Sequence, residues 1–310
     1  PNLSEIITTT LRNRSKSLAD NVTNHNALLR RLSENGNIST VTGRQIVREL
    51  EYASNGTVGF YTGYETLDVS PSDVLTSATF DYKQMAGNVT ISGLEQIQNS
   101  GTEAIINLLE SRIGVLEKTM ANTLSTSLYS DGTGSDGKEV GGLQLLVADA
   151  GTGTVGGINS STFTFFQNVQ TTATSSAFST TNIQADMNTI YLSLVRGSDS
   201  PDLIMADTNA YKSFLGSLQA IQRVTSDRVA TSGFTSVQYL NSDVIFDDAC
   251  PTNKMYFLNT DYLRLEVAAN RNFVPGEAKM SVNQDAMVTP MFWSGNLTCS
   301  NRALQGVIHT

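Results

Sequence analysis

The first candidate for ligand binding in this 310-residue sequence is a glycine-rich run, GTGTVG, at positions 151–156. It matches the GxGxxG pattern, in which glycines let the main chain approach a dinucleotide pyrophosphate at the start of a helix. Here the next residues, 158–163, are poor helix formers, and the acidic residue expected about 20 positions further on is missing. We therefore interpret 151–156 as a loop that binds no dinucleotide.

Carboxylates near a second glycine-rich segment are the candidate metal ligands. Asp131, Asp136 and Asp149 surround this turn, and Asp247 and Asp248 are neighbours after a strand-like run. A calcium loop ends in a glutamate that binds the ion through both oxygens, and the corresponding position here holds a glycine. We interpret both groups as solvated turns and predict no metal site.

Histidine and cysteine are too scarce for the common nucleophilic and zinc mechanisms. His25 and His309, the only histidines, lie near opposite ends of the chain, and Cys250 and Cys299 have no CxxC spacing. A Ser-His-Asp arrangement needs a histidine in a cleft, and the GxSxG nucleophile motif does not occur. The sequence therefore predicts no catalytic, cofactor-binding or metal-binding residues, and we do not expect an enzyme.

Composition and charge narrow the class of protein further. Hydrophobic residues make up 39% and charged residues 16%, which suits a chain that buries a core. No stretch approaches 18 consecutive apolar residues, and no secretory signal is apparent, so we expect a soluble protein made in a reducing compartment. The net charge is −9, but residues 1–48 carry +4. A basic N-terminal arm on an acidic body suggests contact with an anionic surface.

Two unusual elements are expected in the first half of the chain. Residues 3–32 place apolar side chains at helical spacing, which predicts a helix over this range. Aromatic residues then gather in 58–92, around a turn at Ser70-Pro71-Ser72-Asp73, which predicts a long hairpin that pairs 57–69 with 75–87. A lone hairpin is marginal in water, so it must fold back onto its own domain or lie on a neighbouring subunit.

The most regular helical pattern covers residues 101–129, with apolar residues at steps of three and four. Such a helix is about 40 Å long. The stretch 150–185 contains no charged residue, which predicts short strands and loops. Helix and strand then alternate over 181–248, and further strands are expected at 255–258, 262–267, 286–298 and 303–308. The fold class is therefore α+β.

The order of these segments resembles a known family. Arm, long hairpin, long helix and α/β segment, in this order, are similar to a tailed-bacteriophage major capsid protein with the Hong Kong ninety-seven type of fold. Runs in the C-terminal part strengthen the resemblance, namely MYFLNTDYL at 255–263, RNFVP at 271–275, SVNQDA at 281–286 and WSGNLT at 293–298.

The resemblance implies a role for each segment. These are an N-terminal arm at 1–48, an extended hairpin loop at 49–98, a peripheral domain at 99–140 and 259–299 with its spine helix at 101–129, and an axial domain at 141–258 and 300–310. It also implies self-assembly as hexamers and pentamers into an icosahedral shell around double-stranded DNA. The protein would then be found in the virion, after assembly in the host cytoplasm.

The resemblance also assigns contacts to particular residues. The aromatic residues expected to touch a neighbouring subunit are Phe60, Tyr61, Tyr64, Phe80 and Tyr82. The basic residues expected to face the packaged DNA, through non-specific contacts, are Arg30, Arg31 and Arg44. Further partners in such a shell are portal, scaffold and decoration proteins, and no membrane is involved. Some members cross-link through a lysine on the extended loop; Lys83 is the only one here, and we do not predict a cross-link.

Two other classes remain open at this stage. An encapsulin-like compartment shares the fold and holds a cargo enzyme in place of a genome. A tube-forming tail or surface protein is compatible with the composition, which is rich in serine, threonine and asparagine. An enzyme is the third alternative, and a cofactor or metal bound to the purified protein would favour it.

Overall fold

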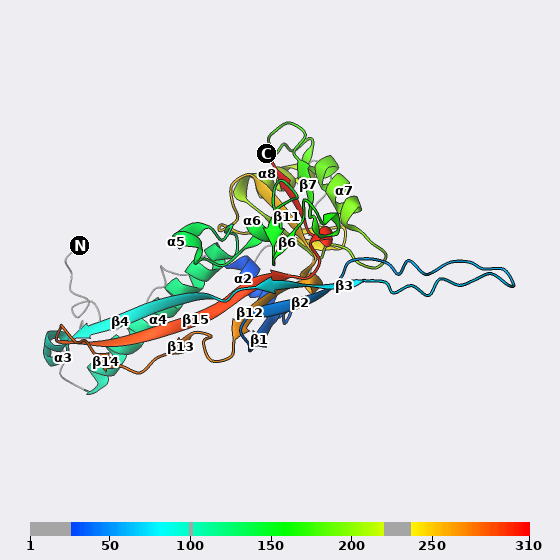
Figure 1. The fold of residues 1–310 in the computed structure, drawn as a ribbon. Helices are drawn as coiled ribbons and strands as arrows, with labels where there is room; N and C mark the ends of the chain where they lie inside the picture. The colour runs from blue at the N-terminus through cyan, green and yellow to red at the C-terminus, as the bar shows by residue number, and fades with distance from the viewer. Residues whose placement is uncertain (1–25, 99–101, 220–236) are drawn as a thin grey trace.

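The computed structural model describes residues 26–98, 102–219 and 237–310. It shows an elongated base, an upper part beside one end of it, and a segment that projects far from both (Figure 1). Two six-stranded sheets organise the described chain, and each contains strands from distant parts of the sequence.

The first sheet runs along the base and is built on one long strand, β15 (Ala286–Cys299). One edge of β15 pairs first with β12 (Leu263–Ala268) and then with the short strands β13 (Val274–Pro275) and β14 (Lys279–Met280). Its other edge pairs with β4 (Lys83–Ser92) over ten residues. The parallel strand β1 (Ile38–Val41) completes the sheet beside β12.

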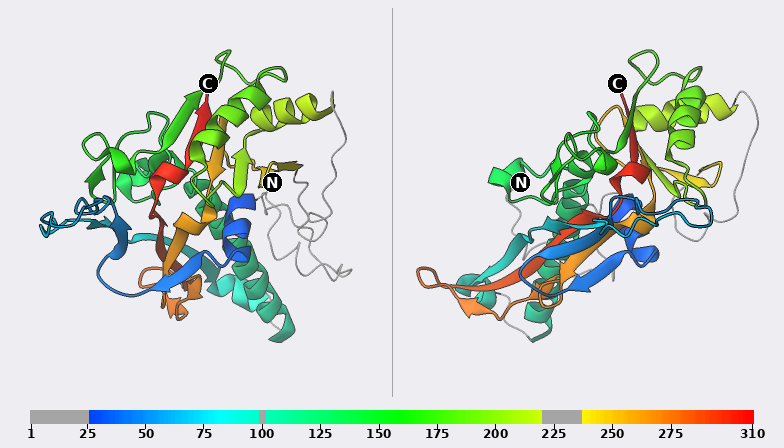
Figure 2. Two further views of the ribbon diagram at one scale, coloured as in Figure 1. Left: turned by 90° about the vertical axis from the view of Figure 1, so that its right-hand side faces the viewer. Right: turned by 45° about the vertical axis from the view of Figure 1, so that its right-hand side comes forward.

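The 26-residue helix α4 (Thr102–Ser127) lies along this sheet (Figure 1 and Figure 2) and confirms the predicted long helix. Its apolar side chains meet the face of β4 that carries Val89 and Ile91, both buried. Gly87 is the point of closest approach, because a Cβ atom there would lie 2.4 Å from a methyl group of Leu116. The absence of a side chain at this position lets the helix settle against the strand.

The second sheet forms the upper part of the molecule. Its strand order is β7 (Val169–Thr172), β16 (Gly306–His309), β11 (Lys254–Leu258), β8 (Leu203–Ala206), β10 (Ser242–Phe246) and β9 (Val237–Tyr239). Helices α7 (Ile183–Leu194) and α8 (Thr208–Gln219) bury an apolar core against one face. The other face joins the larger core shared with the base. The helices and strands predicted after residue 181 are confirmed, except that residues 302–304 form a single helical turn and the last strand covers 306–309 in place of 303–308.

The short elements complete the described chain. The remaining helices are α2 (Ala27–Glu34), α3 (Gly93–Gln98), α5 (Gly134–Gly137) and α6 (Leu143–Leu146), with single turns at η1 (Thr164–Phe166), η3 (Thr260–Tyr262) and η4 (Arg302–Leu304). The remaining strands are β2 (Ile46–Glu51), β3 (Leu75–Phe80), β5 (Thr154–Val155) and β6 (Ile158–Asn159). Residues 151–153 form a loop, as predicted, whereas residues 154–155 are strand β5 and Gly156 lies in the turn of the β5–β6 hairpin. Of the helix predicted at 3–32, residues 27–32 are helical and 3–25 lie outside the described residues.

The predicted hairpin is wrong in its pairing. β3 pairs with β2, with Ile46 opposite Phe80, and residues 52–74 between these two strands form no strand. The segment predicted as the end of the second arm belongs to β4, which pairs with β15. Burial of alternate β4 side chains under α4 favours this long-range pairing over a local hairpin that has no third layer to cover it.

Buried polar side chains join helix α2 and the end of α4 to the upper sheet. The Asp247 carboxylate accepts hydrogen bonds from the Leu28 main-chain N–H at 3.1 Å and the Tyr129 hydroxyl at 2.9 Å. Burial raises the pKa of Asp247, while these donors act in the opposite direction. The predicted solvated turn at Asp247 is therefore wrong, because its side chain is fully buried.

The uncharged stretch 150–185 packs around a charged residue from elsewhere in the chain, Arg302. Its fully buried guanidinium donates to the main-chain oxygens of Leu146 at 2.6 Å and Phe166 at 3.0 Å, and to the Asn168 side chain at 2.9 Å. It also lies over the Phe166 ring. Burial lowers the pKa of Arg302 to about 10, so the side chain stays charged at neutral pH. The Arg302 guanidinium thus connects the segments around Leu146, Phe166 and Asn168 through hydrogen bonds to their neutral oxygens.

Replacing Arg302 is expected to destabilise the subunit. Arg302→Met keeps most of the buried volume and leaves the acceptors unpaired, which costs about 2–4 kcal/mol of the free energy of unfolding. Urea unfolding of the dissociated subunit, followed by circular dichroism, measures this loss. Arg196→Met is the matched control at an exposed arginine and should change stability by less than about 0.5 kcal/mol. Equal effects of the two substitutions would contradict the role given to Arg302.

Candidate assembly surface

Residues 52–74 leave the body between β2 and β3 and project away from it (Figure 1). Within the described chain they form no strand, and local side-chain bonds shape the segment. The Asn55 side chain accepts from the Thr57 N–H at 3.0 Å, and the Asp68 carboxylate accepts from the Ser70 N–H at 2.9 Å. These are Asx turns, which bend a chain without a sheet partner.

Large apolar side chains on this segment are exposed to solvent. Phe60 and Tyr64 are as exposed as in an extended peptide, at 110% and 107%. Four further residues, Val58, Tyr61, Leu67 and Val69, are also exposed. We call these six residues the apolar loop surface. Soluble monomers rarely expose so many large apolar groups together, so this surface is suited to contact with another protein.

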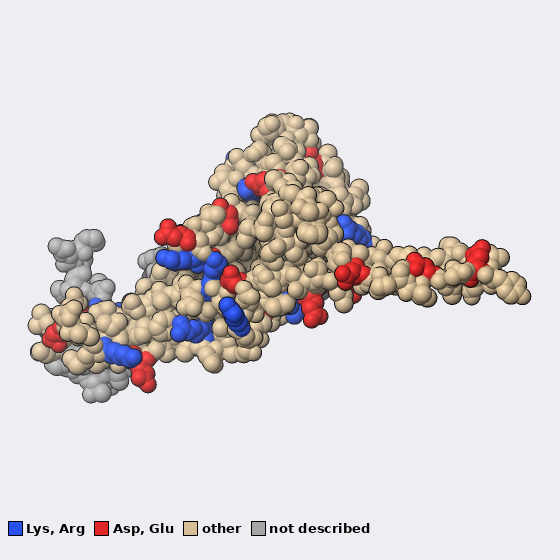
Figure 3. Space-filling model, viewed as in Figure 1, with Lys and Arg blue, Asp and Glu red and all other residues tan. Residues whose placement is uncertain are grey.

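The charges on the segment have one sign. Residues 52–74 contain Glu65, Asp68 and Asp73 and no lysine or arginine. Acidic side chains are spaced along the projection, whereas the base carries both signs (Figure 3). Hydrogen bonds from Ser70 lower the pKa of Asp68, so its carboxylate is ionised at neutral pH. The apolar loop surface therefore suits a partner surface that is apolar and basic.

The base of the projection is fixed to both parts of the body. Arg48 on β2 forms an ion pair with Glu266 on β12, whose side chain is 2% exposed, and the Ser39 hydroxyl also donates to that carboxylate. On β3, the Thr79 N–H donates to the Gly156 oxygen at 2.9 Å. The direction of the projection is thus set by bonds to the first sheet and to the β5–β6 hairpin.

The predicted contact residues divide between two environments. Phe60, Tyr61 and Tyr64 lie together on the projection, whereas Phe80 is 6% exposed within its own core. Tyr82 packs against the same core. Phe80 is the last residue of β3 and lies in the core of the body. Its side chain therefore anchors the projection to the body.

The predicted basic residues do not form one cluster. Arg30 forms an ion pair with Glu34 on the same helix, and Arg31 forms one with Asp243 on β10. Arg44 is exposed between β1 and β2. Lys83 donates to the main-chain oxygen of Gly137 in its own chain, away from the projecting segment.

Sequence reasoning missed a second exposed apolar surface. Leu94 and Ile97 on α3, Met280 on β14, Val282 after it and Met287 on β15 are all exposed. These elements lie at the end of the base opposite the projection (Figure 1). The signal in the sequence was two apolar residues at positions 94 and 97, three apart, with polar neighbours.

Three further features of the described residues concern metal binding, membrane crossing and thiol reactivity. Among them, no three histidine, cysteine or acidic side chains lie close enough to hold a metal ion. None of the described helices combines the length and the apolar character needed to cross a bilayer. Burial raises the pKa of Cys299 to about 12 and keeps this thiol protonated.

Comparison with solved structures identifies the fold. The chain superposes on a subunit of the capsid of cyanophage A-1(L) with a TM-score of 0.77 and 16% identity, covering 96% of both chains. The capsid protein of Myoviridae phage XM1 gives 0.63 and 10%, again over 96% of both. The SrpI encapsulin of Synechococcus elongatus PCC 7942 gives 0.58 and 11%, over 99% of this chain and 95% of that one. No protein-family model and no curated protein matches the sequence.

The class of fold follows from these matches and from the topology. The chain has the α+β fold of tailed-phage capsid proteins, which the sequence resemblance predicted. The particular variant here carries a 23-residue projecting segment, 52–74, between β2 and β3.

The ion pair at the base of the projection gives a stability prediction. Arg48→Met leaves the buried Glu266 carboxylate without its cation and is expected to cost about 2–4 kcal/mol of the free energy of unfolding. Arg48→Met combined with Glu266→Leu removes both charges and should restore at least half of that loss. Urea unfolding of the three proteins gives the comparison. A double variant as unstable as the single one would show that the uncompensated charge is not the cause.

Proposed function

We propose that this chain is the major capsid protein of a tailed phage, which assembles as hexamers and pentamers into an icosahedral shell around double-stranded DNA. The apolar loop surface carries the proposal. Six large apolar side chains project from the body, and within the described chain nothing covers them. A subunit that adds to a shell gains the free energy of burying such a surface, at about 25 cal/mol per Å².

The segments take the following roles in this proposal. They are the N-terminal arm (1–48), the extended loop (49–98), the peripheral domain (99–140 and 259–299) and the axial domain (141–258 and 300–310). The projecting part of the extended loop, residues 52–74, lies on an adjacent subunit and brings its acidic residues and Phe60, Tyr61 and Tyr64 against that subunit. The neighbouring shell proteins would be portal, scaffold and decoration proteins, and the location is the virion, after assembly in the host cytoplasm. A structural shell subunit needs no catalytic residue, cofactor or metal.

Electron microscopy of the purified, concentrated protein tests the proposal. Closed isometric particles of uniform size support a shell, and nuclease-protected DNA inside them supports a virus. The alternative is an encapsulin-like compartment, for which the SrpI encapsulin gives weaker support, with a TM-score of 0.58 against 0.77 for the cyanophage capsid; a protein cargo in place of DNA would support it. Tubes, or a monomer that never assembles, would contradict both readings.

Removing two aromatic residues should block assembly and leave the subunit intact. Phe60→Ser with Tyr64→Ser removes the two most exposed side chains of the loop. The free energy of unfolding should change by less than about 0.5 kcal/mol, since neither residue is buried in its own chain. Sedimentation should show subunits or capsomers where the unchanged protein forms particles. Phe60→Tyr with Tyr64→Phe keeps both rings and should assemble, and a normal yield from the serine variant would contradict the proposal.

The basic residues of the arm are proposed to face the packaged DNA. Arg30→Ala, Arg31→Ala and Arg44→Ala together should lower the DNA retained by nuclease-treated particles, with a difference that is largest at low salt and shrinks at higher salt. The matched control, Lys138→Ala, Arg196→Ala and Lys212→Ala, removes the same charge from exposed positions elsewhere. The ratio of absorbance at the nucleic-acid and protein maxima is the measurement. Equal retention by the two triple variants would rule out a special role for the arm.

A further inference from the structure

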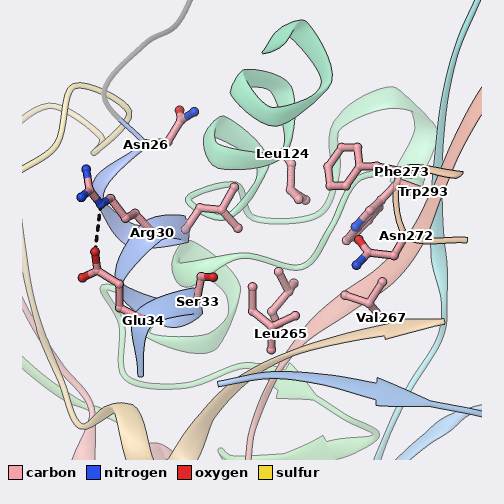
Figure 4. A pocket seen from close by; sticks show the side chains of 12 residues that line it. Asn26, Arg30, Ser33, Glu34, Leu124, Leu265, Val267, Asn272, Phe273 and Trp293 are labelled. Carbon is pink, nitrogen blue, oxygen red and sulfur yellow. Dashed lines mark hydrogen bonds and ion pairs between the residues drawn. The ribbon is translucent and has the colours of Figure 1, made fainter. Parts of the chain in front are cut away.

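A pocket of about 400 Å³ opens between α2, α4 and the first sheet (Figure 4). Its floor is apolar, with Leu124 from α4, Leu265 and Val267 from β12, and Trp293 from β15. Polar side chains form the rim, which is lined by Asn26, Arg30, Ser33, Glu34 and Asn272. This volume is in the range of pockets that accept a ligand or several side chains of a peptide.

The described chain begins at the rim of this pocket. Asn26 is the first described residue, and its side-chain amide donates to the Asn122 side chain on α4 at 3.2 Å. The main chain of Asn26 is not helical, with φ −100° and ψ 55°, so α2 starts only at Ala27. Residues 1–25 lie outside the described residues and are joined to the described chain at the rim of this pocket.

The residues immediately before this point have suitable side chains. Val22 and Leu18 are apolar residues four and eight positions before Asn26. Four residues span at most about 14 Å, so Val22 is tethered within that distance of the rim. A tether this short raises the effective concentration of the segment far above that of any separate molecule.

We propose that this pocket takes the Val22 and Leu18 side chains of the chain's own N-terminal segment. Two features of the pocket fit this occupant. Arg30 and Glu34 on the rim neutralise one another, so a charged ligand gains little there. The indole N–H of Trp293 is buried and makes no hydrogen bond with any described residue, and a docked main chain brings carbonyl acceptors to this wall.

The consequence is a function for the arm that does not depend on shell assembly. With the pocket filled, α2 is held against α4 and β12 by apolar contacts as well as by its bond to Asp247. The direction in which residues 1–17 leave the subunit is then set by the docked side chains.

Thiol labelling of the unassembled full-length subunit tests this proposal. Leu29→Cys places a thiol on the pocket wall, and the two native cysteines are buried. In a Leu18→Ser, Val22→Ser background, a maleimide should label this thiol about tenfold faster, because the reagent reacts only with the open fraction. Leu3→Ser with Ile7→Ser is the matched control, and it should leave the rate unchanged. Circular dichroism confirms that each variant is folded.

A second pair of variants covers the case in which the serine substitutions unfold the protein. Val22→Cys with Leu29→Cys should form a disulfide on mild oxidation, and Thr23→Cys with Leu29→Cys should do so much more slowly, as found by thiol titration and peptide mapping. Equal rates in the labelling or the disulfide comparison would overturn the proposal. Protection of the thiol only in assembled particles would also overturn it, since the occupant would then come from a neighbouring subunit. Neither result depends on whether the particles are capsids.

Discussion

The main-chain hydrogen bonds of β15 are the interaction on which the rest of the structure depends. Along its 14 residues this strand pairs with β4 on one edge and with β12, β13 and β14 on the other. β4 in turn carries α4, and β12 carries β1 and the buried Glu266 that holds the projecting segment. A strand with partners on both edges exposes no pairing groups of its own, so β15 is an interior strand and the edges of this sheet are formed by other strands, such as β1 and β4.

Five acidic or basic residues are buried in the described part of the chain, and three of them fix the position of segments that are distant in the sequence. Arg302 organises loops with no acidic residue, Glu266 fixes the base of the projection through Arg48, and Asp247 connects α2 to the upper sheet. Because an unpaired buried charge is costly, each of these sites admits one arrangement of its neighbours. A chain with only 16% charged residues thus uses them where geometry has to be specified.

Much of the fold could be predicted because its signals are local. The apolar spacing of α4 and the alternation of helix and strand over 181–248 can be recognised without knowledge of their partners, and both predictions are confirmed. The hairpin could not be predicted, because alternation in β4 is equally satisfied by a nearby strand or by β15, some 200 residues away, and only packing under α4 decides between them. Asp247 was misjudged for the same reason, since its donors, Leu28 and Tyr129, come from distant segments.

The sequence indicated that aromatic residues form the candidate surface, but it did not show which of them lie on the projecting segment. The aromatic residues gathered in 58–92 predicted a hairpin that folds back or lies on a neighbouring subunit, but Phe80 and Tyr82 could be separated from Phe60 only once the end of β3 was known. The two apolar surfaces lie at opposite ends of the molecule, and a closed monomer cannot bring them together because the base between them is a paired sheet. No described segment of the chain covers either surface, so other copies or other partners can bury both, and repeated contacts of that kind produce extended assemblies in preference to dimers.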